Sequence, residues 1–150
     1  WVSSGAMYFH RMGLTPESVV HHYLGNPAEF SKPRSYSGML EVSHFHLFAM
    51  GILVLTLVHL MLFAPLAERT KHFGIWLPFG FAVGNEATGW LVRFADPGFA
   101  YLKIATFLGL EASLLWVMAI TLWSLTTGRR GGYRAGTKDR RKLRTDSGEV

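Results

Sequence analysis

Three long apolar stretches, separated by short polar breaks, occupy most of the chain after residue 41. They cover about residues 42–64, 73–94 and 99–126, and Pro65 and Asp96-Pro97-Gly98 end the first two. A helix needs about 20 apolar residues to cross the hydrocarbon core of a bilayer. The pattern therefore predicts an all-α protein, a transmembrane helical bundle in which three spans are visible.

The segments outside these spans complete the predicted organisation. Residues 1–12 begin without an initiator methionine and resemble the end of a fourth transmembrane helix, upstream of residue 1. Residues 13–41 are predicted to form a periplasmic loop with a short helix. That helix starts at Thr15-Pro16-Glu17, because threonine is a good N-cap and proline fits the first helical position. Residues 42–127 form the three-span bundle, and residues 128–150 form a basic cytoplasmic tail.

Basic residues predict the orientation in the membrane. The tail carries eight lysine or arginine residues, and the break after the first span adds Arg69 and Lys71. By the positive-inside rule both segments face the cytoplasm, so we expect a protein of the bacterial inner membrane. Membrane lipid is the expected partner of the tail, and nucleic acid is not expected.

Composition narrows the chemistry. The chain has no cysteine, which excludes disulfides, iron–sulfur clusters, thiolate zinc sites and c-type haem. It also has no hydrolase triad, phosphate-binding loop or nucleotide-binding fingerprint. We therefore do not expect a self-contained enzyme, although a subunit of a membrane oxidoreductase fits the composition.

Three histidines mark the first span. Ionisable side chains inside a membrane are costly and point to function. On a helical wheel His44, Gly51 and His59 lie along one stripe, and His46 points to nearly the opposite face. The imidazoles of His44 and His59 are then about 22 Å apart along the axis, with a glycine between them. This layout suits two flat, bulky groups, one near each membrane surface.

The span from His44 to His59 resembles the b-type, di-haem transmembrane cytochromes. The resemblance implies haem b, with His44 and His59 as axial ligands and His46 as a substitute ligand or as a group that contacts a ligand without binding the iron. It implies that Gly51 lets the macrocycle approach the backbone. It also implies that His10 supplies the second axial ligand, opposite His44, at the site near the periplasmic surface. Electrons would pass between a quinone and a periplasmic cytochrome or a larger membrane complex. The second and third spans contain no histidine, and His72 lies in the predicted loop between the first two.

The chain as a whole also resembles small, uncharacterised four-helix inner-membrane proteins of proteobacteria, a likeness that implies no activity. Two alternatives to haem remain open. In one, the protein handles copper or another transition metal on the periplasmic side, since imidazole and thioether groups suit such ions. In the other, the histidines only make hydrogen bonds between helices. The candidate metal ligands are His10, His21, His22, His44 and His46.

The second and third spans contain small and polar residues of their own. Gly80 and Gly84 form a GxxxG pattern, which favours close helix packing and also suits a face cleared for a cofactor. Asn85 and Glu86 lie in the middle of the second span, and Glu111 lies in the middle of the third. Because Glu111 has no basic neighbour on its own helix, we expect a group from elsewhere to compensate it. The glycine face and the tail also fit a cofactor-free accessory or assembly subunit of a larger membrane complex.

Overall fold

The computed structural model describes the backbone of residues 2–146, and the side chains of residues 5, 6, 8–10 and 12–126. Within these residues the protein is all-α, as the sequence predicts, with no strand. The elements in order are α1 (Val2–Arg11), α2 (Pro16–Leu24), the 3-10 turn η1 (Pro27–Glu29), α3 (Tyr36–Leu62), α4 (Glu68–Phe94), the 3-10 turn η2 (Pro97–Phe99) and α5 (Ala100–Asp146).

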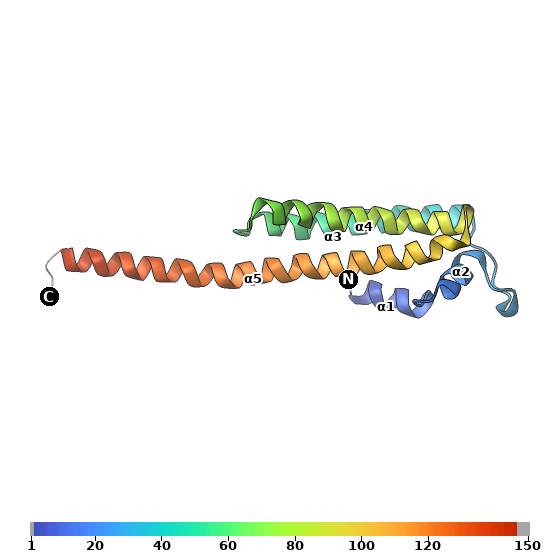
Figure 1. The fold of residues 1–150 in the computed structure, drawn as a ribbon, viewed down its shortest axis with the longest axis horizontal. Coiled ribbons are helices and arrows are strands. Elements are labelled where there is room, and N and C mark those ends of the chain that lie inside the picture. Colours follow the sequence, from blue (N-terminus) through green and yellow to red (C-terminus); the bar gives the residue numbers. More distant parts are fainter. Residues whose placement is uncertain (1, 147–150) are drawn as a thin grey trace.

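The three long helices run side by side (Figure 1). α3 and α4 form an antiparallel pair, and α5 packs along both of them. α1 and α2 lie on the far side of α5 from α3 in this view, and α2 reaches the ends of α4 and α5. The bundle therefore has α5 at its centre.

Two apolar clusters hold the bundle together. The larger one joins α3 to α5 through Val54, Val58, Met61, Leu110, Leu114 and Val117. The smaller one attaches α2 to the ends of the long helices through Val19, Tyr23, Met39, Val92 and Ala100. The short helix is thus part of the packed structure and positions the groups described below.

Local capping explains where the helices begin. The hydroxyl of Thr15 accepts a hydrogen bond from the backbone N–H of Ser18 at 3.3 Å, which confirms the predicted start of α2. The hydroxyl of Ser35 accepts from the backbone N–H of Gly38 at 3.1 Å, so α3 begins at Tyr36, six residues before the predicted span. α5 continues to Asp146, past Gly128, where the sequence predicts its end.

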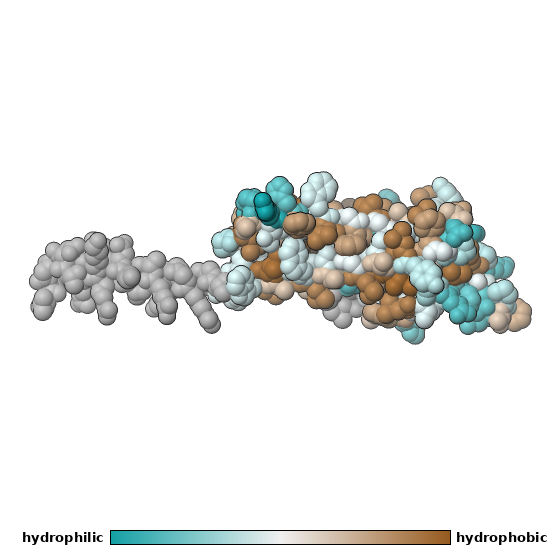
Figure 2. Space-filling view, viewed as in Figure 1, coloured by the Kyte–Doolittle hydropathy of each residue, from teal (hydrophilic) through white to brown (hydrophobic). Residues whose placement is uncertain are grey.

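Two segments of the described chain are long and apolar enough to cross a membrane, Tyr36–Leu62 and Pro97–Thr126. Only 17% and 39% of their most apolar windows are buried, whereas the core helix of a soluble protein is mostly buried. α4 is as long as α3 but carries more polar residues. By length and hydropathy, two of the three predicted spans are therefore confirmed. Figure 2 shows hydrophobic residues along the bundle and hydrophilic ones gathered near its ends.

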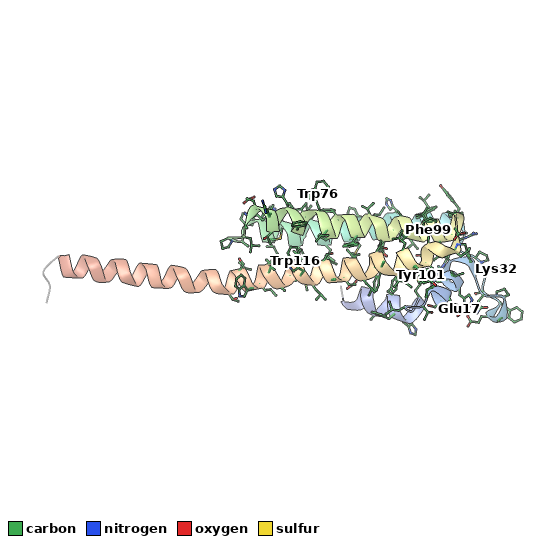
Figure 3. The ribbon with its side chains drawn as sticks, in the orientation of Figure 1. Glu17, Lys32, Trp76, Phe99, Tyr101 and Trp116 are labelled. Carbon is green, nitrogen blue, oxygen red and sulfur yellow. The ribbon has the colours of Figure 1, made fainter. Side chains whose placement is uncertain are left out.

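Large aromatic side chains lie toward both ends of the bundle. Figure 3 shows Trp76 and Trp116 toward the end where α3 turns into α4, and Phe99 and Tyr101 at the other end. Trp76 and Tyr101 are strongly exposed. Aromatic side chains at these two levels are typical of the interfaces between membrane and water.

The helices approach most closely at glycines outside the predicted GxxxG pattern. A Cβ built on Gly109 of α5 would lie 2.6 Å from Cζ of Phe81, and one on Gly89 of α4 would lie 2.7 Å from the hydroxyl oxygen of Tyr23. By contrast, a Cβ on Gly84 would make ordinary contact with Thr106, and one on Gly80 would meet nothing within 4 Å. Gly80 therefore lies on an open surface of α4.

Candidate functional site

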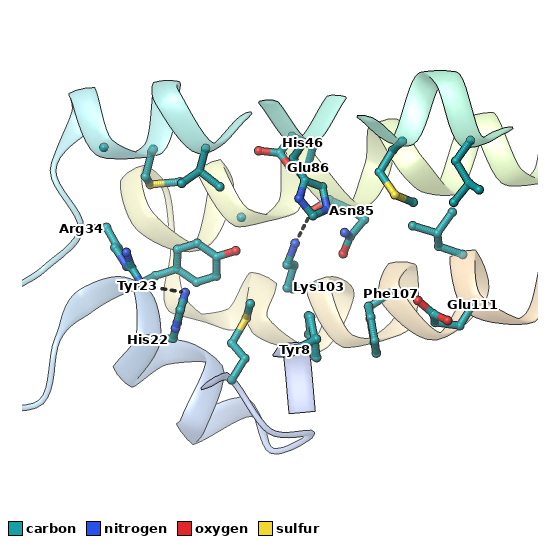
Figure 4. Close-up of a pocket in the computed structure, with 18 residues that line it drawn as sticks. Tyr8, His22, Tyr23, Arg34, His46, Asn85, Glu86, Lys103, Phe107 and Glu111 are labelled. Carbon is teal, nitrogen blue, oxygen red and sulfur yellow. Dashed lines mark hydrogen bonds between the residues drawn. The ribbon is translucent and has the colours of Figure 1, made fainter. Parts of the chain in front are cut away.

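A cavity of about 340 Å³ lies among the helices, in the half of the bundle that α2 covers (Figure 4). Residues from α1 to α5 line it, and most of its wall is apolar. Ionisable side chains converge on it from different helices. They are His22, Arg34, His46, Glu86, Lys103 and Glu111.

Glu86 is held by a network that joins α3 to α4. The hydroxyl of Ser43, itself buried, donates a short hydrogen bond to Oε1 of Glu86. The same hydroxyl oxygen accepts from Nε1 of Trp90 at 2.9 Å. The sequence alone left the partner of Glu86 open, and the structure supplies one from the neighbouring helix.

Replacing Ser43 with alanine is expected to destabilise the α3–α4 pair by about 1–3 kcal/mol. The substitution leaves the indole N–H of Trp90 and the carboxyl group of Glu86 without their partner. Thermal unfolding in detergent, followed by tryptophan emission, measures the effect. Ser37→Ala is the control, since Ser37 is exposed and lies outside the network. Equal unfolding temperatures for the two variants would contradict the prediction.

Lys103 of α5 is the most deeply placed charged residue that the sequence analysis does not single out. It is only 4% exposed, and its Nζ donates to the backbone carbonyl oxygen of Asn85 at 2.5 Å. The same carbonyl accepts from the hydroxyl of Thr88 at 3.0 Å. A signal was present, because Lys103 is the only basic residue between positions 99 and 126.

Two buried polar atoms at the cavity have no hydrogen-bond partner in the described structure. They are Oδ1 of Asn85 and the hydroxyl oxygen of Tyr8. Asn85 is 6% exposed, and the ring of Tyr8 stacks on that of Phe107 with centroids 3.6 Å apart. Buried polar atoms are usually paired, so these two mark a place where a ligand or water completes the structure.

Tyr23, His22 and Arg34 line the end of the cavity nearest α2 (Figure 4). Nη2 of Arg34 lies 3.4 Å from Nε2 of His22. The backbone carbonyl oxygen of Arg34 accepts a hydrogen bond from Nε of Arg93 at 2.8 Å. Burial raises the pKa of the Tyr23 phenol above its ordinary value, and the nearby Glu86 raises it further. The phenol therefore stays protonated and serves as a neutral hydrogen-bonding group.

The structure places the histidines of α3 on two different faces. His44 and His59 are exposed, and a Cβ added to Gly51 between them would meet nothing within 4 Å. Phe48 and Leu55 of the same stripe are 69% and 60% exposed. We call these five positions the histidine face of α3. His46 is exposed as well, but it lines the cavity near Glu86 and Lys103 (Figure 4).

The other histidines are spread over three helices. His10 is exposed on α1, which lies across α5 from α3, so the structure does not bring it beside His44. His21 and His22 belong to α2. His72 lies in α4, in place of the predicted loop, at the same end of the α3–α4 pair as His59. Among the described residues, no three His, Asp or Glu side chains come together as a possible metal site.

Glu111 lines the end of the cavity away from α2 (Figure 4). A Cβ on Gly5 of α1 would lie 4.0 Å from its Oε2, so α1 passes close to this carboxyl group. The acid thus faces the space between helices and is only partly exposed.

A family model for a transmembrane helical domain, Aq_1264_TM, matches residues 13–132. The chain belongs to this family. No curated protein and no solved structure matches the chain. Membership makes the protein a membrane protein that contacts lipid, in agreement with the exposed apolar windows of α3 and α5.

Ionisable groups inside a transmembrane domain are costly to bury in lipid and therefore point to function. The described residues present two such sets. One is the histidine face, on the outside of α3, and the other is the group around Lys103 and Glu86, inside the bundle.

Proposed function

We propose that the protein is a membrane subunit of an electron-transfer complex that binds b-type haem at the histidine face of α3. The observation that supports this most directly is the exposure of His44 and His59 on one helix, with open space at Gly51 between them. Haem supplies one-electron transfer when its iron is held by two axial ligands.

An imidazole exposed to hydrocarbon is costly, so the histidine face favours an occupant. His44 and His59 lie about 22 Å apart along α3 at about 1.5 Å per residue, which separates two cofactors across the membrane. Each of the two residues would give one axial nitrogen. For the inner site His72 is a candidate second ligand within the chain, and for the outer site the second imidazole would come from another subunit.

The proposal includes an orientation. With the basic residues after position 127 and Arg69 and Lys71 on the cytoplasmic side of a bacterial inner membrane, His44 would lie near the periplasmic surface. His59 would then lie near the cytoplasmic surface. A periplasmic cytochrome or a larger membrane complex is the corresponding redox partner.

A reduced-minus-oxidised absorbance spectrum of the complex, purified from its native membrane, tests the proposal. We expect a Soret shift and the α-band of b-type haem with two histidine ligands. A flat spectrum from intact complex would contradict haem binding.

A flat spectrum would favour the second candidate, a cofactor-free accessory or assembly subunit. The open surface at Gly80 of α4 supports that candidate, because small residues allow another helix to approach closely. The remaining alternative, metal handling at the periplasmic side, is tested by metal analysis of the same sample.

A further inference from the structure

We propose that the cavity beside α2 binds the head group of a membrane quinone, with Lys103 and Asn85 as its polar contacts. The cavity is separate from the histidine face, since it lies inside the bundle and the face lies outside. Quinone binding can therefore be measured whether or not haem is present.

The wall of the cavity suits a flat, mostly apolar ring. Its apolar lining includes Met39, Met50, Leu53, Phe107 and Leu110. The volume, about 340 Å³, falls in the range of small-molecule sites, which are mainly apolar with a few placed polar groups. Methionine side chains adapt to the shape of a ring and make favourable contacts with it.

The charges around the cavity favour a neutral ligand. Lys103 and Arg34 face it with basic groups, and Glu86 and Glu111 face it with carboxyl groups. An anionic ligand would meet the two acids, and a cationic ligand would meet the two basic groups. A neutral ring with polar oxygens avoids both conflicts and still uses the hydrogen-bonding groups.

The unpaired atoms define what the ligand must offer. The ammonium group of Lys103 has three N–H donors. One of them bonds to the backbone carbonyl oxygen of Asn85, and the others can donate to a ring carbonyl of the ligand. Oδ1 of Asn85 is buried without a partner and accepts a hydrogen bond, whereas the Tyr8 hydroxyl can donate or accept. A quinone offers acceptors and its reduced form, a quinol, offers donors. A quinone can thus accept hydrogen bonds from Lys103 and from the Tyr8 hydroxyl, whereas only a quinol can donate one to Oδ1 of Asn85.

The test is a titration of the protein in lipid nanodiscs with decylubiquinone, followed by quenching of tryptophan emission. Trp90 lies next to the cavity, hydrogen-bonded to Ser43 and one residue after the cavity-lining Gly89. We expect saturable quenching by decylubiquinone and only linear, unsaturable changes with decanol, which has the tail without the ring. Quenching that does not saturate, or that decanol reproduces, overturns the proposal.

Two substitutions locate the site. Lys103→Met is expected to weaken binding of decylubiquinone by about tenfold, because it removes a donor to a ring carbonyl. Asn85→Leu is expected to weaken binding of the reduced form, decylubiquinol, by about tenfold, because it removes the acceptor of a ring hydroxyl. Lys71→Met is the matched control, since Lys71 pairs with Glu68 at the opposite end of α4 and lies outside the cavity. Asn85→Leu also removes an unpaired buried oxygen, so this variant is expected to fold even if Lys103→Met does not. A folded variant of either residue that binds as tightly as the control overturns the proposal.

Discussion

Replacing His44 or His59 with alanine is expected to remove about half of the haem difference spectrum of the complex, and replacing both to remove nearly all of it. The reason is that each imidazole would hold one haem by its iron, and a haem without an axial histidine loses its low-spin spectrum or dissociates. The measurement is the reduced-minus-oxidised spectrum per mole of purified complex.

Thr56→Ala is the control for these variants. Thr56 is exposed on the same helix, and its hydroxyl bonds only to the backbone carbonyl of Ile52 within the described structure. The control is expected to keep the full spectrum. If His44→Ala and His59→Ala kept it as well, the histidine face would not be a ligand set and the accessory-subunit alternative would gain support.

Replacing Gly109 with alanine is expected to destabilise the protein by about 1–3 kcal/mol, the usual effect of forcing extra volume into a packed interior. The new Cβ would lie 2.6 Å from Cζ of Phe81, a stiff ring at the contact between α4 and α5. The packing loss outweighs the gain in helix propensity, which is at most about 1 kcal/mol for a change from glycine to alanine. Thermal unfolding in detergent measures the difference.

Gly80→Ala is the matched comparison, because the Cβ added there meets nothing within 4 Å. It is expected to leave the unfolding temperature unchanged or to raise it slightly. An unfolding temperature for Gly109→Ala equal to that of Gly80→Ala would mean that α4 and α5 separate easily at this contact. The pair also tests whether the GxxxG pattern or the Gly109 contact governs packing within the chain.

Much of the fold follows from local features of the sequence. Apolar stretches of membrane-spanning length predict long helices, and Thr15-Pro16 predicts the start of α2. Such signals depend only on residues within one helical turn or one stretch of chain. They can therefore be recognised in the sequence without knowing which other helices pack nearby. The start of α3 at Ser35 has the same kind of signal, a serine N-cap, which the apolar pattern concealed because the helix begins before its apolar part.

Of the two candidate sites, one can be predicted from the sequence and the other depends on contacts between helices. The histidine face depends on spacing along one helix, and a helical wheel is enough to separate His44 and His59 from His46. The partner of Glu86, by contrast, is Ser43, 43 residues away on another helix. No periodicity connects such residues, because the register between two helices depends on how their side chains pack.

The sequence by itself determined that this is a helical membrane protein, and which residues share a face of α3. Only the tertiary structure revealed the cavity and the burial of Lys103 against Asn85, and only it separated His10 from His44 by placing α1 across α5. The physical reason is the range of the interactions. Hydropathy and capping act along the chain, whereas a cavity and its hydrogen bonds exist only where several helices meet.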